Sequence, residues 1–161
     1  MGVDVCCYNL NKTGEESGMV STIEDTLIHA VFLAKHLNGC DPQCAITAAL
    51  LELGIPPRLI GFDYLEKAIL VYYEDPTQMF TKDIYPAVGE SYCPRVRAYQ
   101  VEKQIRTVIN EAWTSRDAGV WSCYFPQGNT EKPSNGEFIS MVARFVQLWQ
   151  GCCKGVGYGN E

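Results

Sequence analysis

Apolar side chains recur every three or four residues along most of this chain, the spacing that places them on one face of an α-helix. The repeats predict helices over residues 21–37, 41–53, 61–74, 78–90, 99–113 and 134–150. No segment alternates apolar and polar residues with the period of a β-strand. The pattern therefore predicts an all-α protein.

Polar residues and helix breakers at the ends of these repeats fix the expected helix boundaries. Capping boxes are predicted at Ser21–Glu24 and Ser134–Glu137, and Asp41–Pro42 is typical of a helix start. Gly54 is expected to end the second helix, and Pro86 to bend or restart the fourth. Residues 117–133 are expected to be irregular apart from a short apolar turn over 120–125.

The same pattern divides the chain into three parts. Residues 1–40 are expected to form an N-terminal extension, with a loosely ordered start and one helix. Residues 41–150 are long enough to bury a core and are expected to form one domain. Residues 151–161 are rich in glycine and are expected to be a flexible, frayed tail.

The predicted helix over residues 99–113 has two contrasting faces. Its apolar stripe, which would anchor the helix to a core, consists of Val101, Ile105, Val108 and Ala112. Its opposite face carries two cations, an amide and an aromatic ring, which belong to Lys103, Arg106, Asn110 and Tyr99. The Glu102 carboxylate lies at the side of this face. A short helix and a basic loop precede it, so the segment fits a helix-turn-helix that reads a DNA major groove. A solvated amphipathic helix has the same outline, and both interpretations stay open at this point.

The distribution of charge favours the DNA interpretation more than the total does. The formal net charge is −6, which argues against a general nucleic-acid coat protein. Residues 91–116, however, carry a net charge of +3, whereas residues 1–90 carry −8. The cationic region is therefore the one whose pattern already indicates a DNA reader.

Composition and motifs argue against several other classes of protein. The chain is 47% hydrophobic but has no run of the roughly 18 apolar residues that a membrane span needs. It also lacks a secretory signal, so we expect a cytoplasmic protein without a membrane partner. Eight cysteines and two histidines do not have the spacing of a zinc site, and we expect thiols and no metal ion. No catalytic motif is present, so we expect no enzyme and no cofactor.

From about residue 44 onward the chain resembles the C-terminal effector domain of the sporulation stage-zero response regulator A of endospore-forming bacteria. The matching words keep their order over residues 44–150 and are LELGIPPRLIGFDYLEKAI, KDIYP, VEKQIR, EAW and KPSNGEFISMVA. The resemblance implies a six-helix DNA-binding domain with a helix-turn-helix, here preceded by one extra N-terminal helix. It implies a transcription regulator that binds double-stranded DNA and pairs on tandem sites through its last helix, as a homodimer or heterodimer.

The resemblance also assigns roles to individual positions. VEKQIR matches the base-reading segment of the family, which implies base contacts from Glu102, Lys103 and Arg106. Phosphate contacts are expected from Arg116, Lys132 and the helix start at Ser134, where a simple helix cap is the favoured alternative. The full set of candidate DNA-contacting residues is Arg95, Arg97, Tyr99, Gln100, Glu102, Lys103, Arg106, Thr107, Asn110, Arg116, Lys132, Ser134 and Asn135.

The chain departs from the family pattern inside the reading segment. Tyr99-Gln100 replaces a Ser-Arg pair, Lys103 replaces an arginine, and Thr107 replaces a histidine. Lysine cannot make the planar bidentate contact of arginine. We therefore expect a changed DNA preference, with phosphate contacts from two loop arginines, Arg95 and Arg97, in partial compensation.

The residues before the domain bear on regulation. Only about forty residues precede it, too few for the parallel sheet of a phosphoacceptor receiver, so control through a receiver is not expected. The main hypothesis is a sequence-specific DNA-binding transcription regulator. The alternative is a protein-interaction module of the same fold that pairs with a full-length regulator through the aromatic helix over residues 138–149 and has lost specific DNA binding.

Overall fold

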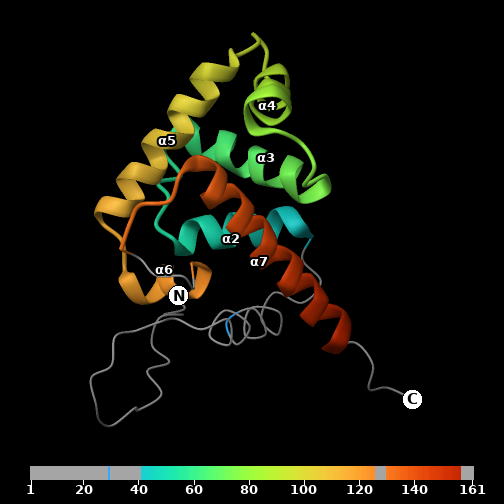
Figure 1. Ribbon diagram of the computed structural model, residues 1–161, viewed down its shortest axis with the longest axis vertical. Helices are drawn as coiled ribbons and strands as arrows, with labels where there is room; N and C mark the ends of the chain where they lie inside the picture. The colour runs from blue at the N-terminus through green and yellow to red at the C-terminus, as the bar shows by residue number, and fades with distance from the viewer. Residues whose placement is uncertain (1–28, 30–40, 126–129, 157–161) are drawn as a thin grey trace.

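The computed structural model describes residues 29, 41–125 and 130–156 of the chain (Figure 1). All regular secondary structure in these residues is helical, so the predicted fold class is confirmed. The elements are α2 (Pro42–Glu52), α3 (Ile60–Glu74), the π-helical turn η2 (Phe80–Ile84), α4 (Tyr85–Glu90), α5 (Ala98–Thr114), α6 (Ala118–Tyr124) and α7 (Asn135–Val156). The helix predicted over 21–37, with its Ser21–Glu24 capping box, lies outside the described residues except for His29.

Helix α3 lies at the centre of the fold, where it packs against α2, α5 and α7. Its inward side chains Leu65, Ala68 and Ile69 are fully buried. In Figure 1, α7 crosses the front of α2 and α3, and α5 runs along one side of the molecule. Burial of apolar side chains from these helices is the main stabilising contribution, and it leaves one long face of α5 at the surface.

The predicted ends of α2 are confirmed. Asp41 caps the helix by accepting a hydrogen bond from the Cys44 amide at 2.8 Å. At the other end the Ile55 amide donates to the Leu50 carbonyl at 3.0 Å, and Gly54 has a φ of +79°. This Schellman motif needs a left-handed residue, which glycine adopts without steric cost.

The predicted capping box at the start of α7 is also confirmed. The Ser134 amide and hydroxyl both donate to the Glu137 carboxylate at 2.8 Å, and the Glu137 amide donates to the Ser134 hydroxyl at 3.3 Å. These bonds, the backbone one first, hold the pKa of the Glu137 carboxyl below its ordinary value of 4.5. The helix cap, the favoured alternative for Ser134, is therefore present.

Pro86 acts as the sequence predicted. The predicted helix over 78–90 changes from the π-helical turn η2 to α4 at Tyr85, and Pro86, which has no amide hydrogen to donate, stands at this change.

Two sequence-based boundaries are wrong. Residues 118–124 form α6, which Asp117 caps by accepting from the Val120 amide at 3.1 Å, whereas an irregular segment with a short turn was predicted. A helix this short shows too few turns for a periodic pattern. Helix α7 also continues to Val156 instead of ending near residue 150, because Cys152 and Cys153 extend its packing against the core.

The aromatic residues of α6 and α7 lie inside the core. Trp121 donates its indole N–H to the Leu53 carbonyl at 3.0 Å and is 1% exposed. Phe138, Phe145 and Trp149 are at most 3% exposed. The expectation that the aromatic side chains of α7 form a protein interface is therefore wrong, because these side chains are buried in the core.

None of the helices in the described part of the chain is both long enough and apolar enough to cross a lipid bilayer.

Candidate nucleic-acid interface

Helix α5 is anchored by the stripe that the sequence predicted. Val101, Ile105, Val108 and Ala112 are at most 1% exposed, as is the neighbouring Ile109. The helix lies so close to α3 that a Cβ on Gly61 would stand 2.4 Å from the Gln104 carbonyl oxygen. Because only glycine permits this approach, α3 fixes the position of α5 through its main chain.

A turn of seven residues, 91–97, joins α4 to α5 and completes a helix-turn-helix. The Val96 amide donates to the Gly89 carbonyl at 3.0 Å, and a Cβ on Gly89 would stand 2.1 Å from the Val96 carbonyl oxygen. The Cys93–Pro94 peptide bond in this turn is cis. The turn therefore holds the start of α5 against the end of α4.

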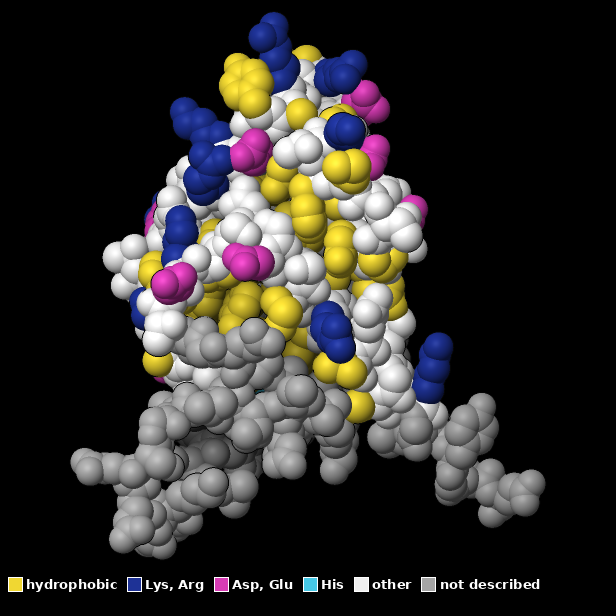
Figure 2. All heavy atoms as spheres, viewed as in Figure 1, with side chains coloured by type: hydrophobic (Ala, Val, Ile, Leu, Met, Phe, Trp, Pro, Cys, Tyr) yellow, Lys and Arg dark blue, Asp and Glu magenta, His cyan; other side chains and the backbone are white. Residues whose placement is uncertain are grey.

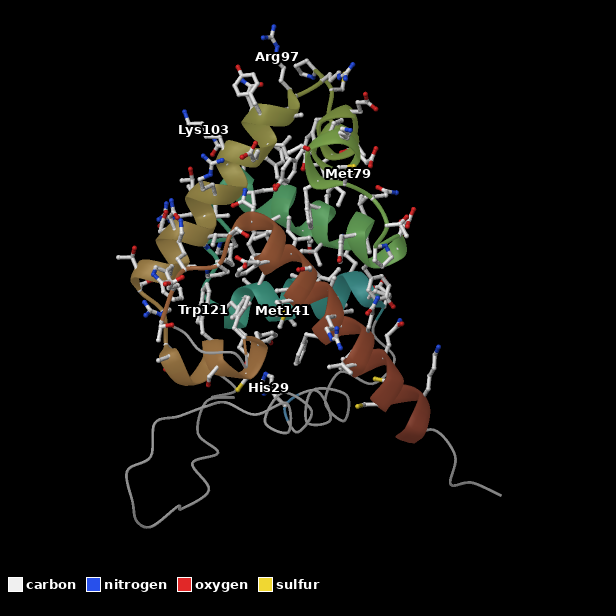
Figure 3. All side chains as sticks on the ribbon, viewed as in Figure 1. His29, Met79, Arg97, Lys103, Trp121 and Met141 are labelled. Atoms are coloured by element: carbon white, nitrogen blue, oxygen red, sulfur yellow. The ribbon has the colours of Figure 1, made fainter. Side chains whose placement is uncertain are left out.

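The opposite face of α5 presents the predicted polar side chains to solvent. Tyr99, Lys103, Arg106 and Asn110 are all exposed, Tyr99 to 59%, and we name these four residues the outer row. Successive members are four, three and four residues apart, so they follow one line along the helix. In Figure 3 the Lys103 side chain projects away from the body of the protein, and Figure 2 shows Lys and Arg side chains gathered along the same edge.

Two hydrogen bonds join the outer face of α5 to the segment that leads into α7. Lys132 donates to the side-chain oxygen of Asn110. The Asn135 amide group donates to the Glu102 carbonyl at 3.1 Å. Residues far apart in the sequence are thus brought to one surface.

An ion pair lies within this surface. The Arg106 guanidinium pairs with the Glu102 carboxylate one turn earlier, and both groups reach solvent. Exposed pairs of this type contribute only about 0.3–0.5 kcal/mol to stability. The pair therefore orients the two side chains without fixing them.

Three further candidates lie at the start of α5. Arg97 is at the tip of the turn (Figure 3), and its amide donates to the Gln100 side-chain oxygen at 3.3 Å, so Gln100 caps the helix. Arg95 pairs with Glu90 at 2.8 Å. The Arg95 and Arg97 side chains are exposed and extend the positive surface beyond the outer row.

The structure separates Arg116 and Thr107 from the outer row. Arg116 lies past the far end of α5, where its guanidinium stacks on the Trp113 ring at 3.6 Å and donates to the Trp113 carbonyl at 3.0 Å. The Thr107 hydroxyl donates to the Lys103 carbonyl at 3.0 Å, beside the row. DNA contacts by these two residues stay predictions, as they do for all the other candidate residues.

Three residues that position the interface are not predicted by the sequence pattern. Gly61 and Gly89 permit the close packing of α5, but a glycine at a helix end has no distinctive local signal. Tyr85 is 4% exposed, and burial raises its pKa above 10.0, while its hydrogen bond to Asn135 acts in the opposite direction. The one indication of its importance in the sequence is that Tyr85 lies in KDIYP, a segment that resembles the family.

An exposed polar and basic face on the second helix of a helix-turn-helix, anchored by a buried stripe, defines a DNA-binding domain of the all-helical class. Comparison with known families gives the same result: the family described as the C-terminal domain of the sporulation initiation factor Spo0A matches residues 46–146. The chain belongs to this family, which is a family of DNA-binding regulatory domains and not of enzymes.

Proposed function

We propose that this protein is a sequence-specific transcription regulator that inserts α5 into the major groove of double-stranded DNA. The observation that carries this proposal is the division of α5 into a fully buried stripe and an exposed outer row. A helix held rigidly by one face can present the other to base edges with little loss of conformational freedom.

The outer row has the chemistry that base recognition requires. Lys103 and Arg106 donate hydrogen bonds of the kind that guanine accepts, and Glu102 can accept from the amino group of cytosine. Tyr99 offers an exposed ring to a thymine methyl group or a sugar. At about 1.5 Å per residue the row is roughly 16 Å long, which corresponds to about five base pairs.

Backbone contacts would complete the interface. Arg95 and Arg97 lie at the end of α5 where the turn approaches it, and their exposed guanidinium groups suit phosphate oxygens. Such contacts would set the register of α5 in the groove, whereas the outer row would supply the sequence preference.

Selection from a random duplex pool, followed by titration of the enriched duplexes at two salt concentrations, tests the proposal. We expect an enriched motif and an affinity that falls with salt by about 0.9 log units per log unit of salt for each phosphate contact. Weak binding without an enriched motif would contradict sequence-specific recognition and favour the interaction module.

The protein-interaction alternative has less support because the aromatic side chains of α7 are buried. Pairing through the last helix, which the family resemblance implies, would instead use its solvent-facing edge. Met141 and Leu148 lie on that edge half-buried, and Arg144 is exposed beside them. Sedimentation of the protein with and without the selected duplex tests whether pairing occurs on DNA.

A further inference from the structure

A surface cavity of about 290 Å³ lies beside α5, where that helix meets the η2–α4 segment and the start of α7. Phe80 and Tyr85 line the cavity from the η2–α4 side, Arg106 lines it from α5, and Lys132 lines it just before α7. Small-molecule sites usually occupy about 300–1,000 Å³. The cavity is therefore at the lower limit for a whole ligand and suits one unit of a longer one.

The cavity combines an aromatic wall with hydroxyl groups at its rim. Phe80 stacks on Tyr72 with ring centroids 5.4 Å apart, and its centroid is 6.3 Å from that of Tyr85, so neighbouring rings hold this wall in place. Thr81, an exposed residue of η2, and Ser134 add hydroxyl groups to the lining, but the Ser134 hydroxyl already donates to Glu137 and leaves Thr81 as the available donor. Aromatic carbon suits a deoxyribose ring, and hydroxyl groups are frequent phosphate donors.

The charged residues that line the cavity are Glu102, Arg106 and Lys132, and Lys132 is the one that forms no ion pair among the described residues. Lys132 donates to Asn110, a neutral side chain, and no carboxylate of the described residues forms an ion pair with it. Arg106, by contrast, is paired with Glu102. Lys132 is therefore the cavity residue whose charge is best able to attract a phosphate.

The Glu137 amide and carboxylate at the start of α7 do not supply this attraction. The hydroxyl of Ser134 already accepts from the Glu137 amide, and the Glu137 carboxylate adds a negative charge at the helix start. An anion in the cavity would be held by side chains, not by the helix terminus.

We propose that the cavity seats one sugar–phosphate unit of the DNA strand that passes beside α5, with Lys132 and Thr81 as its phosphate contacts. This inference rests on the proposed insertion of α5 into a major groove. Arg106 belongs to both the outer row and the cavity wall, and Asn110 of the row holds Lys132. A major groove is about 12 Å wide, and the diameter of a helix with its side chains is about 10–12 Å. A helix in the groove therefore lies against the DNA strand that flanks it.

Two variants test the seat, each with a matched control. Thr81→Trp fills the cavity from its exposed rim, and Lys132→Ala removes the charge. We expect both to weaken binding of the selected duplex and of a scrambled duplex roughly tenfold, as for the loss of one charged hydrogen bond. Lys132→Ala should also lower the slope of log affinity against log salt by about one contact. Thr81→Ser keeps the hydroxyl and should bind within about twofold of wild type. Lys154→Ala removes an exposed charge at the opposite end of α7 and should also stay within about twofold, because a screened distant charge matters little.

Other outcomes would overturn the seat. One is wild-type affinity and an unchanged salt slope for Thr81→Trp and Lys132→Ala on both duplexes. Another is binding of free deoxyadenosine monophosphate that Thr81→Trp abolishes while duplex binding is unchanged, which would make the cavity a site for free nucleotides. Failure of the proposed function has a separate sign, because the wild-type protein would then enrich no motif from the random pool.

Discussion

Gly61 on α3 lies directly against the main chain of Gln104 on α5, so that a Cβ added to Gly61 would stand only 2.4 Å from the Gln104 carbonyl oxygen. The contact sets how deeply α5 sits in the fold and therefore how far its outer face stands out. We expect Gly61→Ala to destabilise the protein by about 1–3 kcal/mol, the usual cost of overpacking. Thermal unfolding measures this loss. Gly151→Ala is the control, since a Cβ there meets nothing within 4 Å, and equal midpoints for both variants would contradict the argument.

The outer row should control sequence preference without controlling the fold. We expect Lys103→Ala and Arg106→Ala each to lose about 1–3 kcal/mol of discrimination between the selected and a mismatched duplex. Because both side chains are exposed, the thermal midpoint should hardly change. Lys154→Ala, which removes an exposed charge from the last turn of α7, is the control. A fall in midpoint that matched the loss of binding would show that these residues support the fold instead.

Glu102 should affect the choice of DNA more than stability. Glu102→Gln removes the pair with Arg106, which as an i,i+4 pair is worth about 0.2–0.5 kcal/mol. It also removes a negative charge from the surface that we propose to face DNA, so we expect tighter binding of scrambled duplexes and weaker selection for cytosine. Glu111→Gln is the matched control, because Glu111 is on the same helix but pairs with Arg58. A scrambled duplex bound equally by both variants would argue against Glu102 at the interface.

The start of α7 should respond to acid. The pKa of Glu137 is lowered in the folded protein, so its bonds to Ser134 stabilise the fold above the ordinary carboxyl value of 4.5. That contribution is lost as the pH falls through the lowered pKa. We expect Glu137→Gln to lower the thermal midpoint at neutral pH, and the difference from wild type to shrink in acid. Glu131→Gln, which changes an exposed carboxylate outside the capping box, is the control and should show no such convergence.

Local chemistry explains why much of the fold could be predicted. Asp41, Gly54 and the Ser134–Glu137 capping box act through hydrogen bonds to residues a few positions away, so the sequence shows both partners. Helix α6 was missed because it is short and is held mainly by tertiary contacts such as the bond from Trp121 to Leu53. The same kind of contact explains why the aromatic side chains of α7 are buried and do not form an exposed interface.

For the interface, periodicity along one helix determined which residues of α5 face outward, since that depends only on the helical repeat. The sequence by itself therefore determined the all-α class, the family and the outer row. Only the tertiary structure decided that Lys132 and Asn135 meet α5, that Arg116 packs on Trp113, and that a cavity opens beside the row. Those relationships join residues distant in the chain, and they depend on how the helices pack, which no local pattern encodes.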